Sequence, residues 1–172
     1  MISIIAGTNL PHSKAAVLAH FLELQSPDSL MLDLATLDNG FIHEQMYSRQ
    51  APELTAIQKE FLIEPDKWIF IVPEYNGTFP GYLKLFLDAC SVHDYQNTFK
   101  NKKIWLIGLG SGRGGNLRGL DHLTTAMNYL GCIIFPNRLA ISQINSKIKD
   151  TEIHDDELLR ELELGLKQFL DF

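Results

Sequence analysis

The sequence has few cysteines, no excess of positive charge and no long apolar run. Its two cysteines, Cys90 and Cys132, exclude a disulfide framework and have no metal-binding spacing, so no metal site is expected. Lys and Arg number 15 against 21 Asp and Glu, and the net charge of −6 disfavours binding to nucleic acid. No apolar run approaches the roughly 20 residues that span a bilayer, and the first residues lack a signal-peptide pattern. We therefore expect a cytoplasmic protein with no nucleic-acid or membrane partner.

What the sequence does contain is an alternation of strand and helix patterns. Its 172 residues, 45% of them hydrophobic, predict a single domain over residues 1–172. Alternation with short connections gives right-handed crossovers, and helices then cover both faces of a parallel sheet. We predict a three-layer α/β sandwich with a five-stranded parallel sheet. The predicted strands are 2–6, 29–34, 67–72, 103–107 and 132–135, and the predicted helices are 15–24, 52–62, 81–90, 120–130 and 155–170.

Ligands of such sheets bind beyond the carboxyl ends of the strands, so the loops after the first, third and fourth strands are the candidate site. In the first loop, residues 7–14, Thr8 and Ser13 bracket the start of a helix. The free amides and positive dipole end of a helix N-terminus favour an anion there. Ser13 as a simple N-cap is the alternative, and the sequence leaves both open.

The second and third loops have compositions suited to a flat ligand. Residues 73–81 contain two prolines and two glycines, which fix a path whose amides can meet the edge of a planar ring beside Tyr75. Residues 108–115 contain five glycines, which let the backbone approach such a ring closely, with Ser111 at its edge. An ordinary turn and a flexible connection are the respective alternatives.

Together these loops resemble the NAD(P)H-dependent FMN reductase family of flavodoxin-like proteins. The resemblance is most specific at Pro-Glu-Tyr-Asn (73–76), followed by Pro80-Gly81, Leu83-Lys84 and Leu87-Asp88. It implies a sheet in the order 2-1-3-4-5 and FMN bound without a covalent link. It also implies a homodimer or homotetramer in which a neighbouring subunit helps to close the flavin site.

The resemblance also implies the roles of individual residues. The flavin itself supplies the chemistry, so no catalytic acid or base is expected. Leu10 stands where the family often has arginine, which leaves His12, Lys14, or the helix dipole with the hydroxyls to meet the phosphate charge. The phosphate would contact Thr8, Asn9 and Ser13, the ring would contact Pro73, Glu74, Tyr75, Asn76 and Gly77, and Ser111 and Gly112 would flank its other side.

The expected function is an FMN-dependent NAD(P)H oxidoreductase. It would pass hydride from NADPH or NADH, through bound FMN, to a small-molecule acceptor such as a flavin or quinone. A flavodoxin-type electron carrier without its own NAD(P)H activity is one alternative, and a ligand-free scaffold is another. Residues 41–51, which show no period, are an expected irregular loop and a candidate for either a wall of the site or a subunit contact.

Overall fold

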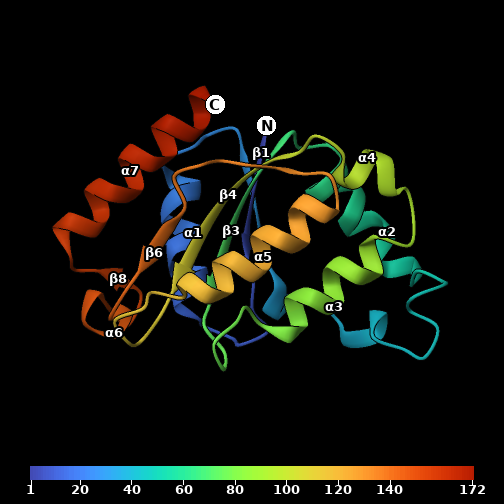
Figure 1. Cartoon of the computed structure of the whole chain (residues 1–172), viewed down its shortest axis with the longest axis horizontal. Coiled ribbons are helices and arrows are strands. Elements are labelled where there is room, and N and C mark those ends of the chain that lie inside the picture. The colour runs from blue at the N-terminus through green and yellow to red at the C-terminus, as the bar shows by residue number, and fades with distance from the viewer.

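A parallel sheet lies at the centre of the protein, with helices on both faces, in a computed structural model that describes residues 1–172 (Figure 1). The strand order β2-β1-β3-β4-β5 and the parallel pairing confirm the predicted sheet. This order is the one found in flavodoxin-like folds. The strands are β1 (Ile2–Ala6), β2 (Ser29–Asp33), β3 (Lys67–Pro73), β4 (Lys103–Leu109), β5 (Ile133–Ile134) and β6 (Leu139–Ile141).

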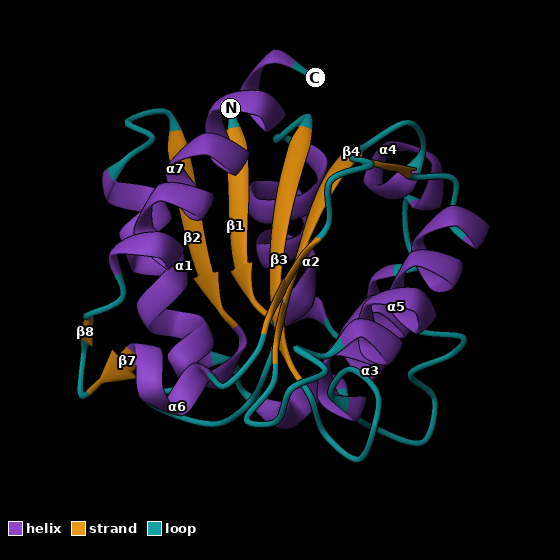
Figure 2. Cartoon of the chain, turned by 60° about the vertical axis from the view of Figure 1, so that its left-hand side comes forward, coloured by secondary structure: helices purple, strands orange, loops and turns teal.

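The helices form the two outer layers. The first and last helices, α1 (Lys14–Leu24) and α7 (Asp156–Asp171), cover one face of the sheet (Figure 2). The other face is covered by α2 (Pro52–Gln58), the π-helical turn η3 (Lys59–Ile63), α3 (Gly81–Cys90), α4 (Tyr95–Phe99) and α5 (Leu117–Tyr129). None of the helices is both long enough and apolar enough to cross a membrane.

Alternating side chains of the central strands divide the core between the two faces. Along β3, Trp68, Phe70 and Val72 belong to the cluster under α3 and α5, whereas Ile69 and Ile71 belong to the cluster under α1 and α7. All five side chains are fully buried. Burial on both faces explains why this strand is a continuous apolar run rather than an alternating one.

The fifth position of the sheet differs from the prediction of one strand at 132–135. It holds two short strands, because β5 pairs with Lys103 and Ile104 while β6 pairs with the later part of β4. Pro136 lies between them and has no amide to donate to a neighbouring strand. The prediction of a single strand was therefore wrong in extent, although its place in the sheet order is correct.

Several short elements lie outside the predicted pattern. They include α4, α6 (Ile144–Lys147), the hairpin strands β7 (Ile148–Lys149) and β8 (Glu152–Ile153), and the 3₁₀ turns η1 (Leu34–Thr36) and η2 (Asn39–Phe41). In the segment 41–51, Phe41 and Met46 are buried in the core cluster beneath α3. That segment therefore contributes to packing and lines neither cavity at the strand ends, so it is not the expected wall of the site, and a subunit contact stays a prediction.

The contact between α7 and the sheet gives a test of this packing. A Cβ at Gly165 would lie 2.4 Å from Cζ2 of the Trp105 ring, which is itself fully buried. Although alanine is favoured over glycine in helices by about 1 kcal/mol, we expect Gly165→Ala to lower the free energy of unfolding by about 1–3 kcal/mol through overpacking. Urea unfolding measures this change. Lys167→Ala, an exposed substitution on the same helix, is the control, and an unchanged or stabilised Gly165→Ala protein would contradict this packing.

Candidate active site

Two cavities lie at the carboxyl edge of the sheet, where the loops after β1, β3 and β4 meet. The smaller, of about 270 Å³, is lined by residues of all three loops and by Ile144 and Asn145 of α6. The larger, of about 740 Å³, lies between the second and third loops and the start of α5. Glu74 and Ser111 line both cavities, which are therefore neighbours.

The first loop is tied to the second by a buried hydroxyl. A Cβ at Gly7 would lie 2.8 Å from Cγ1 of Val72, so β1 and β3 approach closely where the loop begins. Thr8 is fully buried, and its Oγ1 is 2.8 Å from the hydroxyl of Tyr75. The amide of Leu10 also donates to Thr8 Oγ1, at 3.3 Å. Thr8 thus joins the two loops from below the cavity rather than lining it.

Ser13 begins helix α1 as its N-cap. Its Oγ accepts a hydrogen bond from the amide of Ala16 at 3.1 Å, which is the N-cap alternative that the sequence left open. Ser13 also lines the smaller cavity, together with His12 and Lys14. Capping takes up one of the first amides of the helix and leaves the others at its N-terminus without an intrahelical partner. An anion site at this point remains compatible with the cap.

The second loop contains a tight hairpin turn. The amide of Tyr75 donates to the carbonyl of Thr78 at 2.9 Å, and the amide of Thr78 donates back at 3.2 Å. Asn76 and Gly77 have φ of +53° and +80°, which is typical of the type I′ turn that Asn-Gly favours. Thr78 Oγ1 lies 2.8 Å from Nδ1 of His122 on α5. The turn is therefore held at both its base and its side.

The glycines of the third loop fall into two groups. A Cβ at Gly115, whose φ is +55°, would lie 2.8 Å from the backbone of Ala140 in β6, and one at Gly110 would lie 3.0 Å from Gly115. These glycines are required by packing. Gly112 and Gly114 line the larger cavity instead, and a Cβ at either would meet no atom within 4 Å. Only the second group leaves a flat, open wall for a ligand.

Asn116 connects the third loop to the end of β3. Its side-chain amide donates to the carbonyl of Val72 at 3.0 Å, and the residue is almost fully buried with a φ of +67°. Its Oδ1 is buried without a hydrogen-bond partner. This residue fixes the start of α5 against the sheet below the larger cavity.

The structure brings most of the predicted site residues to the cavities. Thr8 lies beneath them, Asn9 is exposed outside their walls, and Gly77 lies at the tip of the turn. The predicted residues that line one or both cavities are Ser13, Pro73, Glu74, Tyr75, Asn76, Ser111 and Gly112.

Other wall residues were not predicted. The larger cavity is also lined by Leu117 and Arg118 on the first turn of α5, and the smaller cavity by Asn145 on α6. The helical pattern begins at Leu120 in our sequence interpretation, so the first turn of α5 fell outside it. No sequence signal marks α6, which has only four residues.

The side chains around the cavities suit ligand binding better than covalent catalysis. No cysteine lines either cavity, and elsewhere in the fold burial raises the pKa of Cys132 to about 12 and also raises that of Cys90, so neither thiol is an activated nucleophile. No group of three or more His, Cys, Asp or Glu residues is arranged to hold a metal ion. A helix N-terminus and lysine in one cavity and an open glycine wall in the other fit a phosphorylated flat ring.

Comparison with known proteins agrees with this geometry. The family model described as NADPH-dependent FMN reductase matches residues 1–146. The chain is 27% identical to a 2-hydroxy-1,4-benzoquinone reductase of a Burkholderia species, over 77% of this chain and 73% of that protein. It is also 27% identical to the FMN-dependent NADH:quinone oxidoreductase 3 of Halalkalibacterium halodurans, over 91% of this chain and 76% of that protein.

Among solved structures, FerB, a flavoenzyme NAD(P)H:(acceptor) oxidoreductase from Paracoccus denitrificans, superposes with a TM-score of 0.80. The alignment covers 99% of this chain and 94% of FerB at 19% sequence identity, and it shows a shared fold. Because the family model spans most of the chain, including all three loops, the chain belongs to the NADPH-dependent FMN reductase family, whose members are oxidoreductases that use FMN.

Proposed function

We propose that this chain holds FMN across the two cavities and uses it to pass two electrons from NADH or NADPH to a small acceptor. The observation that supports this most is the meeting of three strand-end loops around cavities that share Glu74 and Ser111. All 172 residues would act as one FMN-binding domain, working in the cytoplasm where both nicotinamide nucleotides are available.

The two cavities would divide the cofactor between them. We assign the phosphate to the smaller one, with Ser13 and the first amides of α1 as hydrogen-bonding groups and Asn9 at its margin. Thr8 would act from beneath, through its hydrogen bond to Tyr75. The ring would lie against the larger cavity, between the segment 73–77 and the third-loop residues Ser111 and Gly112.

The contribution of the chain is binding and orientation. Bound FMN supplies two-electron chemistry, which needs no side-chain acid or base. The type I′ turn fixes the amides of the second loop, because both of its cross-turn hydrogen bonds and its contact to His122 are satisfied. Polar groups fixed in this way act on a developing charge with little reorganisation.

A flat acceptor, such as a quinone or a free flavin, fits the larger cavity. The walls at Gly112 and Gly114 carry no side chain, so the backbone offers a surface on which a planar molecule can lie. The two curated relatives above are named as quinone reductases, which supports a quinone as the acceptor.

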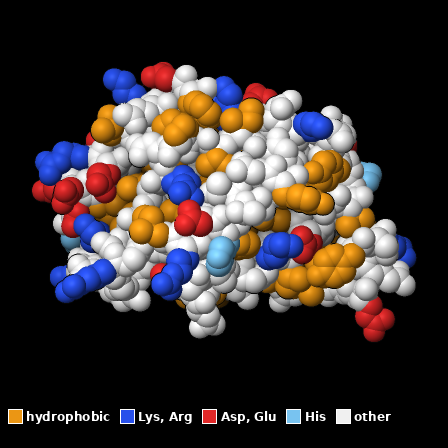
Figure 3. All heavy atoms as spheres, in the orientation of Figure 1, with side chains coloured by type: hydrophobic (Ala, Val, Ile, Leu, Met, Phe, Trp, Pro, Cys, Tyr) orange, Lys and Arg blue, Asp and Glu red, His pale blue; other side chains and the backbone are white.

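We also propose that two copies of this chain associate through the surface between α3 and α5. A groove of about 700 Å³ runs there, lined by apolar side chains that include Phe79, Leu87 and Tyr129. Tyr129 is 86% exposed. Orange, apolar side chains gather over this part of the molecule in Figure 3, with blue and red groups among them.

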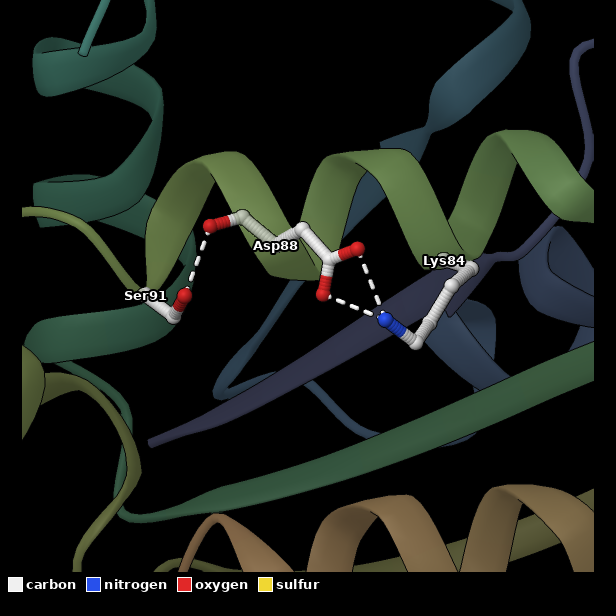
Figure 4. A network of polar contacts seen from close by, with 3 residues as sticks. All are labelled: Lys84, Asp88 and Ser91. Carbon is white, nitrogen blue, oxygen red and sulfur yellow. Dashed lines mark hydrogen bonds and ion pairs between the residues drawn. The ribbon is translucent and has the colours of Figure 1, made fainter. Parts of the chain in front are cut away.

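Charge complementarity supports a second copy as the occupant of this groove. Lys84 Nζ donates to both carboxylate oxygens of Asp88, at 2.5 and 2.7 Å, and Ser91 Oγ donates to the Asp88 carbonyl at 2.7 Å (Figure 4). When two copies of a helix pack antiparallel about a two-fold axis, a lysine of one copy can face the aspartate one turn away on the other, and the reverse contact forms as well. The groove also includes Thr78 and His122, at the side of the hairpin turn, so a second copy would lie next to the flavin site.

The first test of the proposed function is cofactor binding followed by turnover. We expect FMN to bind with a Kd of about 1 μM or below, and the loaded protein to oxidise NADH or NADPH in the presence of a quinone. Flavin absorbance and fluorescence measure binding, and absorbance at 340 nm measures turnover. Binding without direct reduction by either nucleotide would indicate an electron carrier, and no FMN binding would indicate a scaffold.

A second test fills the open wall of the larger cavity. Because a Cβ at Gly112 meets nothing within 4 Å, Gly112→Val is expected to leave the free energy of unfolding nearly unchanged while weakening FMN binding by at least about tenfold. Gly40→Val, at a glycine in η2 with ordinary contacts, is the control. Equal FMN affinity in both variants would contradict our placement of the ring.

A third test concerns association. We expect size-exclusion chromatography with light scattering to show a dimer or tetramer, and Lys84→Asp to shift it toward monomer because like charges then face each other across the two-fold axis. The double variant Lys84→Asp with Asp88→Lys restores complementarity and is expected to restore association. Lys167→Asp on α7, at the opposite face, is the control. A monomeric wild-type protein would contradict the proposal.

A further inference from the structure

A further cavity lies at the opposite edge of the sheet, where β3 and β4 begin and where both chain ends are found (Figure 2). Its volume is about 450 Å³. The charged residues of its wall are four lysines and one aspartate, namely Lys67, Lys100, Lys102, Lys103 and Asp66. We call it the lysine cavity. The length of β3 and β4 separates it from the cavities assigned to the flavin, and the proposed function makes no use of it.

Two of these lysines lie side by side at the starts of neighbouring strands. Lys67 and Lys103 are register partners in β3 and β4, and like charges in that position repel each other. Burial, followed by the charge of Lys103, lowers the pKa of Lys67. Lys67 Nζ donates to the carbonyls of Phe169 and Leu170, at 3.1 and 2.6 Å, and Lys103 Nζ donates to the backbone oxygen of Phe172. These contacts with the end of α7 orient both ammonium groups, while the repulsion between them persists.

The other two lysines form a second pair toward η3 and α4. Lys102 is only 8% exposed, and its Nζ donates to the carbonyls of Ile63 and Pro65, at 2.5 and 2.6 Å. An ammonium group has three N–H donors, so one donor of Lys102 has no acceptor. Lys100, just after α4, is exposed, and its side chain takes part in no ion pair. Neutral carbonyls satisfy donors but supply no counter-charge to a buried cation.

The wall of the lysine cavity has an excess of positive charge in a chain whose net charge is −6. Asp66 is its one carboxylate, and no ion pair joins any of the four lysines to an acidic side chain. The wall also includes the exposed amide side chains of Gln96 and Asn101, which can donate hydrogen bonds. Two pairs of lysines match a ligand with two linked anionic groups, and phosphates form strong, charge-assisted hydrogen bonds with lysine.

We propose that the lysine cavity binds a diphosphate group, with Lys67 and Lys103 contacting one phosphate and Lys100 and Lys102 contacting the other. Free pyrophosphate and a nucleoside diphosphate both present this group. The bound anion removes the repulsion between Lys67 and Lys103, so it also strengthens the attachment of the end of α7 to the sheet. The site is independent of the proposed function, because it shares no wall residue with the flavin cavities.

Isothermal titration calorimetry of the protein in excess FMN, without divalent cations, tests this proposal. We expect pyrophosphate to bind with a Kd of about 10–100 μM at low salt, and to bind more weakly as salt rises. Orthophosphate, which reaches only one pair of lysines, is expected to bind at least about tenfold more weakly. ADP is the arm that distinguishes the sources, since tighter binding than pyrophosphate indicates a nucleotide and weaker binding indicates the free anion. Pyrophosphate is also expected to raise the Tm.

Matched variants connect this binding to the cavity. Lys100→Gln is expected to weaken pyrophosphate binding by about three- to tenfold, because it removes one cation from an exposed position without disturbing the core. Asp66→Asn removes the one carboxylate of the wall and is expected to tighten binding by about twofold or more. Lys149→Gln, an exposed substitution in β7, is the control and is expected to leave the affinity unchanged.

Three results would overturn the proposal. They are the absence of saturable pyrophosphate binding, equal affinities in the wild-type protein and in both wall variants, and binding that occurs only when FMN is left out. The last result would place the anion in the flavin site. None of the three bears on FMN binding or turnover, by which the proposed function is tested.

Discussion

The close approach of the third loop to β6 is the contact on which the site depends. Gly110 donates from its amide to the carbonyl of Ile141 at 3.0 Å, and Gly115 leaves no space for a Cβ against Ala140. A side chain at Gly115 would push the loop away from the sheet and displace the wall formed by Gly112 and Gly114. Because the chain runs directly from β6 into α6, the same contact also places Asn145 beside the first turn of α1.

Individual hydrogen bonds then set the position of the loops, whereas the sheet supplies most of the stability. The bond between Thr8 and Tyr75 joins loops that leave β1 and β3, and the bond from Asn116 to Val72 joins β3 to α5. Each such bond contributes about 0.5–1.5 kcal/mol net, less than the burial of one large core side chain. These hydrogen bonds mainly fix the relative positions of the elements, since each bond connects two elements that border a cavity.

Whether a strand or helix can be predicted from the sequence depends on the length of its pattern of apolar residues. The strand at 67–72 was predictable because burial on both faces makes it a continuous apolar run, and the helix from Pro52 because proline suits a first turn. The convergence of three loops followed from parallel strands ending at one edge of the sheet. By contrast, Leu139–Ile141 has three residues after a proline-broken segment, too few to show a period, so β6 was missed. Missing β6 also concealed the packing role of Gly110 and Gly115, which sequence reasoning had attributed to a ligand.

The lysines with hydrogen-bonded partners differ in the kind of group that each one contacts. At the opposite edge of the sheet, near both chain ends, Lys67 donates to the carbonyls of Phe169 and Leu170, and Lys102 to those of Ile63 and Pro65. Burial lowers the pKa of Lys67 and of Lys102, and Lys67 lies at the C-terminal end of α7, where a cation is favourable.

Lys84 and Lys147 are instead paired with carboxylates. Lys14 alone among these lysines has a neutral side chain as its partner and lies at the positive end of a helix.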